Sequence, residues 1–366
     1  MLKSIVAALL LCSSWGTGYS ENESQELALV VGTYTDTGSH GIYSLRFNQE
    51  TGAYVLLDSL ALVNPSYLTF GKDSRVFYAV SELGDKNASL NSVGFNAKTG
   101  QMRLLNTVAT DGEDPCYVEV TNRMALTANY SGGSLSTFVI NRDGTLSKLK
   151  TRFEGHVGGP DSSRQGQAHI HCVKKMNDGY ILASDFSADQ LLAFRLDTAD
   201  NVLKPRGVAG RLPLDSGPRH IITSRNGRLV YVMSELSGAV TVFQYHAGRV
   251  KLVQSVLSDS AFARGGADIH LTPDGRFLYA SNRLKNDGLS IFQVLSNGKL
   301  RKVGYQRTGI HPRNFNITPN GRYLLAACRD SDMIQIFRID KRSGMLEDTG
   351  RLINLPRPVC IQFAKR

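Results

Sequence analysis

A unit of about 48 residues recurs along this chain of 366 residues, and the repeat limits the folds that the chain can adopt. The register of the clearest copies is set by four turn glycines, which are 48, 48 and 46 residues apart: Gly179, Gly227, Gly275 and Gly321. Each glycine lies in an Asn-Asp-Gly, Asn-Gly-Arg or Asp-Gly-Arg turn between two runs of apolar or β-branched residues, a pattern typical of a β-hairpin. A fixed period of this length indicates a repeat architecture rather than two or three unrelated domains.

The repeat occurs seven times, with six copies complete at their centres and a seventh that the end of the sequence cuts short. The seventh begins at Arg357, and the complete copies cover residues 64–82, 114–130, 167–185, 217–235, 266–283 and 311–329. Further strand-like runs follow the central hairpins, as in residues 239–245 and 334–339. Each unit therefore supplies about four antiparallel strands.

The fold expected from this repeat is an all-β, seven-bladed β-propeller with four-stranded antiparallel blades. Propeller blades contain about 40 to 50 residues, and the 337 residues from Leu27 to Phe363 accommodate about seven of them. The seventh unit lacks outer strands, which the N-terminal runs at residues 27–31 and 41–45 can supply. We therefore expect the last blade to be closed by N-terminal strands, within a single domain that spans residues 21–366.

The first 20 residues have the features of a secretory signal peptide. Lys3 supplies the positive charge, residues 5–12 form a short apolar run, and Gly18-Tyr19-Ser20 fits a small-x-small cleavage site. The run is much shorter than the ~20 apolar residues that span a bilayer, so stable membrane insertion is not expected. We predict cleavage after Ser20 and export to the periplasm, and a cytoplasmic location only if the signal is not used.

Composition places the chain among globular proteins and leaves the choice of ligand open. Hydrophobic residues make up 42% and charged residues 20% of the chain, which excludes disorder. Lys and Arg number 42 against 32 Asp and Glu, a net charge of +10 that could attract nucleic acid, anionic lipid or a small anionic substrate. Basic residues are interspersed with acidic ones and no RNA-binding signature is present, so nucleic-acid binding is not expected.

The cysteines that remain after removal of residues 1–20 are expected to be buried free thiols. They are Cys116, Cys172, Cys328 and Cys360. None forms a C-x-x-C element, each lies in an apolar strand-like run, and a fold of this size does not need disulfides for stability.

Two columns of largely ionisable residues follow the repeat. The first column stands eight residues before the turn glycine and reads His171, Arg219, Ala267 and Arg313, with Ser66, Cys116 and Val359 in the less regular units. The second stands about eight residues after it and reads Glu82, Tyr130, Asp185, Glu235, Arg283 and Arg329. Because the second strand of a hairpin returns to the face where the first began, both columns should converge at one mouth of the central channel.

The arginines in these columns predict a binding site for an anion. A guanidinium group holds carboxylate or phosphate through two parallel hydrogen bonds, and charges grouped in a pocket shift one another's pKa values. The same residues could instead form a ring of salt bridges between neighbouring blades. No Gly-x-Ser-x-Gly elbow, phosphate-binding P-loop or His-Glu-x-x-His helix is present, so those hydrolase classes lack their local signatures.

His169 and His171 face the same way on an extended strand, and their role is open on spacing alone. They could serve in acid/base or anion-binding chemistry, make ordinary structural hydrogen bonds, or bind a metal, although no third ligand is identifiable. We favour acid/base or anion-binding chemistry and expect neither a metal nor an organic cofactor. His220 lies beside the first column and shares this ambiguity.

Several short motifs together resemble the lactonase family of seven-bladed propellers, which includes cycloisomerase-2-type 6-phosphogluconolactonases and the fungal carboxy-cis,cis-muconate lactonising enzyme. The resemblance extends over nearly the whole mature chain. The motifs that carry it are Val31-Gly32-Thr33-Tyr34, Ala128-Asn129-Tyr130-Ser131-Gly132-Gly133, His169-Ile170-His171, Gly217-Pro218-Arg219-His220, Ser234-Glu235-Leu236, Ser281-Asn282-Arg283 and His311-Pro312-Arg313-Asn314-Phe315.

The resemblance implies a pocket at the channel mouth that uses a histidine, two arginines and a glutamate. These catalytic residues correspond to His171, Arg219, Glu235 and Arg283. The residues predicted to bind the substrate are His169, Asn129, Asp185, His220, Arg313 and Arg329.

The activity that the resemblance implies is hydrolysis of the ring ester of a sugar lactone, with 6-phosphoglucono-1,5-lactone as the favoured substrate. Arg219 or Arg283, together with His171, would stabilise the oxyanion of the tetrahedral transition state. Glu235 would take a proton from the attacking water, provided that burial raises its pKa and the adjacent arginines do not cancel that rise.

Two alternative functions use the same face of the propeller. One is lactonisation of a carboxymuconate, and the other is an exported propeller that binds a glycan or a protein without catalysis. The expected partner in the preferred reading is a small anionic lactone, and the protein is expected to be a monomer.

Overall fold

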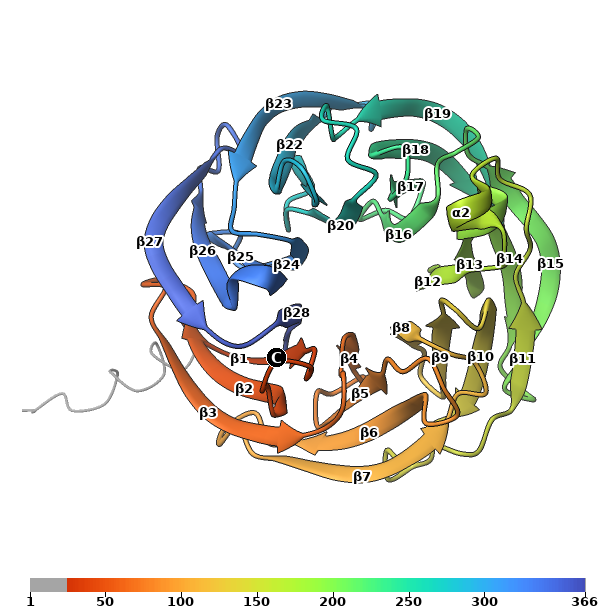
Figure 1. Cartoon of the computed structure of the whole chain (residues 1–366), viewed down its shortest axis with the longest axis horizontal. Helices are drawn as coiled ribbons and strands as arrows, with labels where there is room; N and C mark the ends of the chain where they lie inside the picture. Colours follow the sequence, from red (N-terminus) through yellow and green to blue (C-terminus); the bar gives the residue numbers. More distant parts are fainter. Residues whose placement is uncertain (1–24, 366) are drawn as a thin grey trace, which may run out of the picture.

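The computed structural model describes residues 25–365, and within this range the chain forms seven four-stranded antiparallel sheets arranged in a ring (Figure 1). The predicted seven-bladed β-propeller is therefore confirmed. The predicted signal peptide, residues 1–20, lies outside the described residues. None of the helices among the described residues is long and apolar enough to cross a membrane.

Six blades use consecutive strands, and each innermost strand is followed outward by the next strands in the chain. The strands of these blades are β4 (Leu68–Phe70), β5 (Val76–Ser81), β6 (Ser89–Phe95) and β7 (Met102–Ala109); β8 (Pro115–Val120), β9 (Met124–Asn129), β10 (Ser134–Val139) and β11 (Thr151–Glu154); β12 (Ile170–Lys175), β13 (Tyr180–Asp185), β14 (Gln190–Asp197) and β15 (Val202–Arg211); β16 (Pro218–Thr223), β17 (Leu229–Ser234), β18 (Ala239–His246) and β19 (Arg249–Leu257); β20 (Gly266–Leu271), β21 (Phe277–Asn282), β22 (Gly288–Val294) and β23 (Leu300–Arg307); and β24 (Pro312–Ile317), β25 (Tyr323–Cys328), β26 (Met333–Ile339) and β27 (Leu346–Asn354).

The seventh blade joins the two ends of the chain. Its innermost strand is β28 (Pro358–Phe363), followed outward by β1 (Glu26–Thr33), β2 (Gly41–Asn48) and β3 (Tyr54–Ala61). Strands β1 and β28 pair in antiparallel register, with Val31 opposite Ile361. The predicted closure of the last blade by N-terminal strands is confirmed, and Figure 1 shows the blue C-terminal strand beside the red N-terminal ones.

The turn glycines lie between the first and second strands of their blades, as the repeat predicts. Gly179, Gly227, Gly275 and Gly321 have φ angles of 83°, 69°, 74° and 67°. Glycine is favoured here because side chains with a Cβ seldom adopt a positive φ at low cost. These turns direct the second strand back toward the face where the first strand starts.

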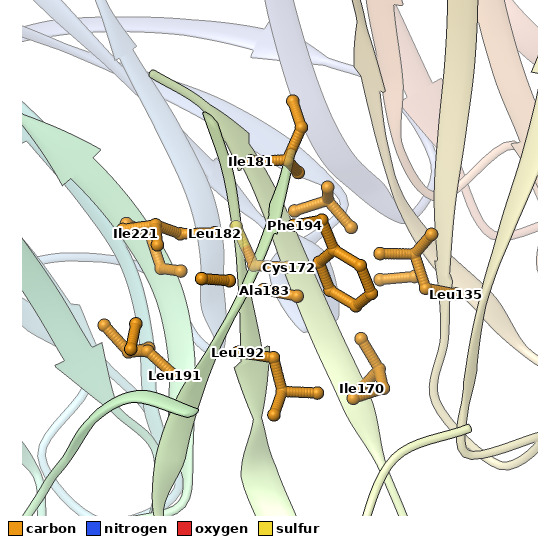
Figure 2. Packing of buried hydrophobic residues seen from close by; sticks show 14 of the residues in the cluster. Leu135, Ile170, Cys172, Ile181, Leu182, Ala183, Leu191, Leu192, Phe194 and Ile221 are labelled. Carbon is orange, nitrogen blue, oxygen red and sulfur yellow. The ribbon is translucent and has the colours of Figure 1, made fainter. Parts of the chain in front are cut away.

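The hydrophobic core lies between the faces of neighbouring blades. In Figure 2, Phe194 of β14 packs beside Leu135 of β10, and Ile221 of β16 lies on the other side of the same blade. Burying a side chain of this size stabilises the fold by roughly 1.5–3 kcal/mol. Each sheet is therefore covered on both faces, which explains why second strands such as β17 and β25 have nearly continuous apolar sequences.

Helical structure among the described residues is confined to short segments on the connections. These are α2 (Ser162–Gln165) and the 3₁₀ turns η1 (Phe186–Ala188) and η2 (Arg329–Ser331). The four described cysteines are free and buried, which confirms the prediction of buried thiols.

Candidate active site

A β-bulge near the start of most innermost strands places the residues of the first column. In the pairing of β16 with β17, Pro218 stands opposite Ser234 and His220 opposite Met233, so Arg219 is the extra residue. The same irregularity occurs at the equivalent place in five other innermost strands, at His171, Arg313, Cys116 and Val359 and between Gly266 and Ile269. Because a bulge re-aims the side chain of its extra residue, it explains how a column of unlike residues reaches one site.

The residues of the second column, except Asp185, directly follow the second strand of their blades, and hydrogen bonds hold the backbone there. The amide of Glu235 donates to the carbonyl oxygen of Gly217 at 2.8 Å, and its carbonyl oxygen accepts from the amide of Gly266 at 3.1 Å. Gly266 starts the innermost strand of the next blade, and a Cβ at this position would collide with the carbonyl oxygen of Ser234. Glu235 is therefore fixed at a boundary between two blades.

Glu235 lies at the centre of a cluster of three arginines from different parts of the chain. Its Oε2 atom is 3.0 Å from Nε of Arg219 and 3.0 Å from Nη2 of Arg283. Its Oε1 atom is 2.6 Å from Nη2 of Arg164, a residue of α2. The structure thus brings Glu235, Arg219 and Arg283 together, as the sequence predicts, and adds Arg164.

The charge state of Glu235 follows from these contacts. Burial alone acts to raise its pKa, but the positive charges of Arg283, Arg219 and Arg164 outweigh burial and lower the pKa to about 2. The condition for Glu235 to act as a base, that the arginines do not cancel the effect of burial, is therefore not met in the ligand-free protein. A carboxylate with this pKa takes up protons poorly at neutral pH.

Arg219 and Arg283 are buried and held by further acceptors. Nη1 of Arg219 donates to the carbonyl oxygen of Ala267 at 2.8 Å, and Nε of Arg283 donates to that of Gly265 at 2.9 Å. Burial lowers the pKa of Arg283 to about 9, although Glu235 opposes the shift, so the group remains charged at neutral pH. Both guanidinium groups are fixed charges at the site.

A histidine and an aspartate stand behind each of these two arginines. Nη1 of Arg219 lies 3.0 Å from Nε2 of His220, whose Nδ1 is 2.7 Å from Oδ1 of Asp268. An arginine only donates and a carboxylate only accepts, so the proton of the neutral ring is on Nδ1. Burial and the charge of Arg219 lower the pKa of His220 to about 4, which keeps the ring neutral at pH 7.

Arg283 has the corresponding arrangement on its other side. Its Nη1 lies 3.3 Å from Nε2 of His311, and Nδ1 of this histidine is 3.3 Å from Oδ2 of Asp330. His220 therefore supports an arginine in the structure, and its predicted contact with substrate stays a prediction.

His171 and His169 lie beside the arginine cluster, and both are buried. Burial and the charge of Arg219 hold the pKa of His171 well below its usual value, so the ring is neutral, and Nδ1 lies 3.6 Å from Sγ of Cys116. His169 stacks on the ring of Tyr130 at 4.0 Å, and its Nδ1 donates to the Tyr130 carbonyl oxygen at 2.7 Å. Nε2 of each ring has no hydrogen-bond partner within residues 25–365.

Arg313 forms a second group with residues of the first and last blades. Its Nη2 is 3.6 Å from Oε1 of Glu82, and its guanidinium group lies 5.4 Å from the centre of the Tyr34 ring. The Tyr34 hydroxyl donates to the same Glu82 oxygen at 2.9 Å, and Ser66 donates to the other. Arg313 is therefore near the cluster and forms an ion pair with Glu82 that is longer than a hydrogen bond.

Asp185 and Asn129 were predicted to bind substrate, but their side chains make hydrogen bonds to other residues of the protein. The carboxylate of Asp185 accepts hydrogen bonds from Gln190 and from the backbone amide and the ring of His156. Asp185 is the last residue of β13, whereas Glu235 is the residue after the corresponding strand, so the two side chains have different surroundings. The position equivalent to Glu235 in that blade belongs to Phe186. Asn129 bonds to three hydroxyl groups of its own blade, those of Thr127, Ser134 and Ser136.

The predicted role of Arg329 is also not supported by its contacts. Its Nε and Nη2 atoms bind the two oxygens of Asp330 at 2.7 and 2.9 Å, a closed bidentate pair. Since the fork that would hold an anion is occupied by a neighbouring carboxylate, this guanidinium group is not available in the way the sequence suggested.

Arg164 is the site residue that the repeat could not reveal. It lies on the segment between β11 and β12, residues 155–168, which we call the strap and which stands outside the hairpins that define the repeat. A length excess between the copies at residues 114–130 and 167–185 is the signal that could have drawn attention to it.

The fold and the cluster define a seven-bladed propeller with an arginine-rich site at one face of its ring. Residues 28–363 match the family described as lactonase, 7-bladed beta-propeller. The chain belongs to this family.

Known relatives cover nearly the whole chain. A 6-phosphogluconolactonase of Formosa agariphila is 32% identical over 346 residues, which are 91% of this chain and 96% of the relative. The crystal structure of a putative 6-phosphogluconolactonase from Bacteroides uniformis is 53% identical with a TM-score of 0.91, and covers 93% of this chain and 99% of its own. The structure of a periplasmic gluconolactonase from Pseudomonas aeruginosa is 32% identical with a TM-score of 0.88, with the same shares of the two chains.

Proposed function

We propose that this protein is a lactone hydrolase that opens the ring ester of a gluconolactone to the free hydroxy acid. The observation that carries the proposal is the buried carboxylate of Glu235 between three arginines, beside the neutral imidazole of His171. Fixed positive charges suit a reaction in which a carbonyl oxygen becomes negative, and a carboxylate and an imidazole can handle the protons.

The relatives narrow the substrate to lactones of gluconic acid, with or without a phosphate. One relative is named a 6-phosphogluconolactonase and another a gluconolactonase. Around Glu235 and Glu82, four guanidinium groups face two carboxylates, which leaves an excess of two positive charges. A phosphate monoester carries about −1.5 to −2 charges at neutral pH, so the phosphorylated lactone matches this excess.

The first chemical step is attack of a water oxygen on the lactone carbonyl carbon. A new C–O bond forms, and the carbonyl oxygen takes up the negative charge. We assign stabilisation of this oxyanion to Arg219 or Arg283 together with His171. The thiol of Cys116, which burial keeps protonated by raising its pKa, can donate to Nδ1 of His171 and leave a hydrogen on Nε2 for the oxyanion. Loss of one such donor typically reduces the rate by about 10²- to 10³-fold.

The second step breaks the bond between the carbonyl carbon and the ring oxygen. Glu235 accepts the proton that the water loses and returns a proton to the departing ring oxygen, so that the products are one carboxylic acid and one hydroxyl group. Water is the only co-reactant, and the acid ionises in solution. In the ligand-free protein the arginines oppose the first transfer, and the carboxylate has to lose one of them before it can serve as a base.

We also propose that the protein acts after export. The support is the signal-like sequence of residues 1–20 and the similarity to a gluconolactonase described as periplasmic. N-terminal sequencing of protein secreted by the native host tests this, because export with processing predicts an N-terminus at Glu21.

The test of the proposed function is lactone disappearance with purified protein lacking residues 1–20. The substrates are 6-phosphoglucono-1,5-lactone, glucono-1,5-lactone and a carboxymuconate lactone assayed in the reverse direction, each corrected for spontaneous hydrolysis in buffer. We expect acceleration with at least one gluconolactone, and loss of most of it in Arg219→Ala. If the wild-type protein is no faster than buffer with any gluconolactone, the proposed function is wrong, and turnover of the muconate compound alone would assign the lactonising activity instead.

A further inference from the structure

We propose that Arg164 binds the phosphate of the lactone and that, in doing so, it moves away from Oε1 of Glu235 and uncovers that oxygen for the attacking water. The inference rests on the proposed function and assigns the anion subsite to the strap. Arg313 and Arg329 were the arginines of the repeat predicted to bind substrate, and Asp330 already occupies the fork of Arg329.

Arg164 differs from the other arginines of the site in its exposure and in its unused donors. Its side chain is 36% exposed, against 2% for Arg219 and 6% for Arg283. Glu235 and the hydroxyl of Tyr130 both contact its Nη2 atom, and Nε and Nη1 have no hydrogen-bond partner within residues 25–365. Free donors on a planar fork are what a phosphate or carboxylate requires.

The two arginines of the repeat that were predicted to bind substrate are less exposed than Arg164. Arg329 makes a bidentate pair with Asp330, and Arg313 lies between Glu82 and the ring of Tyr34. Arg164 is therefore the most exposed of these guanidinium groups, and it can bind an anion while giving up one charged contact.

The strap keeps its position without the bond from Arg164 to Glu235. Nη2 of Arg264 holds Asp161 at 2.6 Å, and Nε2 of Gln165 donates to Oδ1 of Asp189 at 3.0 Å. The amide of Gly159 donates to the carbonyl oxygen of Ser187 at 2.7 Å. Because these anchors lie on both sides of Arg164, its flexible side chain can turn toward a ligand without unfolding of the strap.

The two oxygens of Glu235 are covered unequally, and this gives the movement a chemical consequence. Oε2 is held by Arg219 and Arg283, whereas Arg164 is the one residue of the described range 25–365 that holds Oε1. When Arg164 turns to the phosphate, Oε2 stays fixed and Oε1 becomes available to accept a hydrogen bond from water. The carboxylate therefore keeps its orientation, and Oε1 can act on the attacking water.

The charges around Glu235 support the same sequence of events. The charged and titratable groups that face it are Arg219, Arg283, Arg164, Arg313, Tyr130 and His169. Removal of one of the three bonded arginines raises the pKa of Glu235 from about 2 toward its ordinary value, since burial then meets less opposition. The anionic substrate would in this way bring Glu235 closer to the basicity that proton transfer needs.

The experiment compares wild type and Arg164→Gln on two lactones that differ only in the phosphate. With 6-phosphoglucono-1,5-lactone, we expect kcat/KM of the variant to fall by about tenfold or more. With glucono-1,5-lactone, which has no phosphate for Arg164 to bind, we expect no comparable loss, because glutamine leaves Oε1 uncovered. The ratio of the two kcat/KM values should therefore fall by about tenfold or more. Arg164→Lys keeps the charge without the fork and should recover only part of the activity on the phosphorylated lactone.

Binding of the product acids gives a readout independent of turnover. Calorimetry should show that 6-phosphogluconate binds wild type at least tenfold more tightly than it binds Arg164→Gln, while gluconate binds the two alike. Arg142→Gln is the matched control, because Arg142 is an exposed arginine in the turn after β10, on the opposite face of the ring. This control should match wild type in both assays.

The outcomes separate this inference from the proposed function. A wild type that opens neither lactone contradicts the proposed function itself. A wild type that is active, with Arg164→Gln equally weakened on both lactones or unchanged on both, contradicts the role of Arg164 and leaves the lactone hydrolase intact. Selective loss on the phosphorylated lactone, with weaker binding of its product, supports the inference.

Discussion

Nη2 of Arg283 lies 3.0 Å from Oε2 of Glu235, and this ion pair joins two neighbouring blades of the ring. Glu235 follows β17 and Arg283 follows β21, so the pair connects equivalent positions of successive repeats. Both side chains are buried, with exposed fractions of 10% and 6%. The same carboxylate thus contributes to the cohesion of the blades and to the proposed chemistry.

Substitution of Glu235 by glutamine should lower both activity and stability. The amide has no charge to offset three guanidinium groups, and breaking a buried ion pair typically costs about 3–5 kcal/mol. Loss of the general base should reduce kcat by roughly 10²- to 10⁴-fold. Urea unfolding and lactone hydrolysis measure the two effects separately. A folded variant with the kcat of wild type would show that Glu235 does not transfer the proton.

The stability of the protein should decrease as the pH falls from about 6.5 to 4, in part because of His220. Its pKa is about 4 in the folded protein and near 6.5 in the unfolded chain, so the unfolded chain binds more protons in this interval. By linkage, unfolding becomes easier on acidification, by up to about 1.4 kcal/mol per pH unit for each such group.

His220→Gln tests this contribution. Glutamine can donate to Asp268 and accept from Arg219 without titrating, so the slope of unfolding free energy against pH should be smaller by up to one proton between pH 4 and 6.5. Chemical unfolding at several pH values measures the slope. An unchanged slope in the variant would contradict a neutral, low-pKa His220.

The sequence alone predicted the ring, the hairpins and the closing blade because the repeat is read from local patterns. The turn glycines fix the register, and the truncated last unit requires strands from the N-terminus. The positions of Arg219 and Glu235 also follow from the spacing, since every blade repeats the same geometry. The β-bulge at Arg219 was not predictable in this way, because a shift in the register between two paired strands leaves no pattern in the sequence of either strand.

Three features of the site depend on contacts that no spacing encodes. Asp185 stands one residue before the position of Glu235, because the turn at Gly179 is one residue shorter than its counterparts. Arg164 lies outside the repeat, so no comparison between copies could find it. The pKa of Glu235 results from arginines of two blades and the strap, and it could be stated only as a condition before their distances were known.

Loosening the strap should weaken selectivity for the phosphorylated lactone without a large loss of stability. Arg264 binds Asp161 on the strap and Asp215 on the next connection, and its side chain is 37% exposed. Exposed ion pairs contribute about 0–1 kcal/mol, so Arg264→Gln should fold normally. Hydrogen exchange should become faster in residues 156–166 in particular.

Arg276→Gln is the control for this prediction. Arg276 pairs with Asp274 in a turn at the opposite face of the ring, so its loss should leave both hydrogen exchange in the strap and selectivity unchanged. If Arg264→Gln leaves exchange in the strap at the rate of wild type, Arg264 does not anchor it.

The thiols should resist modification in the folded protein. Cys116, Cys172, Cys328 and Cys360 are buried, and burial raises the pKa of the last three to about 12. Because the thiolate is the reactive form, Ellman's reagent should detect no rapid thiol at pH 8 in native protein and four after unfolding, provided that residues 1–20 have been removed. A fifth thiol would indicate that Cys12 is retained, and fewer than four without reductant would indicate a disulfide.

Asp268→Asn should destabilise the protein although it only replaces one oxygen by an amide nitrogen. Oδ1 accepts hydrogen bonds from Nδ1 of His220 and the amide of Ile269, and Oδ2 accepts from Asn314, the amide of Phe315 and Nε2 of His270. Whichever way the new amide is turned, its NH₂ group faces a backbone amide donor, that of Ile269 or that of Phe315. A buried donor left without an acceptor costs about 1–3 kcal/mol, and more where a charge was involved.

The same substitution should reduce kcat through His220 and leave KM nearly unchanged. If the amide NH₂ is turned toward Nδ1 of His220, the ring proton moves to Nε2, where it opposes Nη1 of Arg219. Arg219 then loses its support, and stabilisation of the oxyanion weakens. Asp274→Asn, an exposed acid in the same blade, should change unfolding free energy by no more than about 0.5 kcal/mol. The donors around the carboxylate of Asp268 leave no low-energy orientation for an amide at this position. A variant Asp268→Asn with the stability of wild type would therefore mean that the carboxylate does not orient His220.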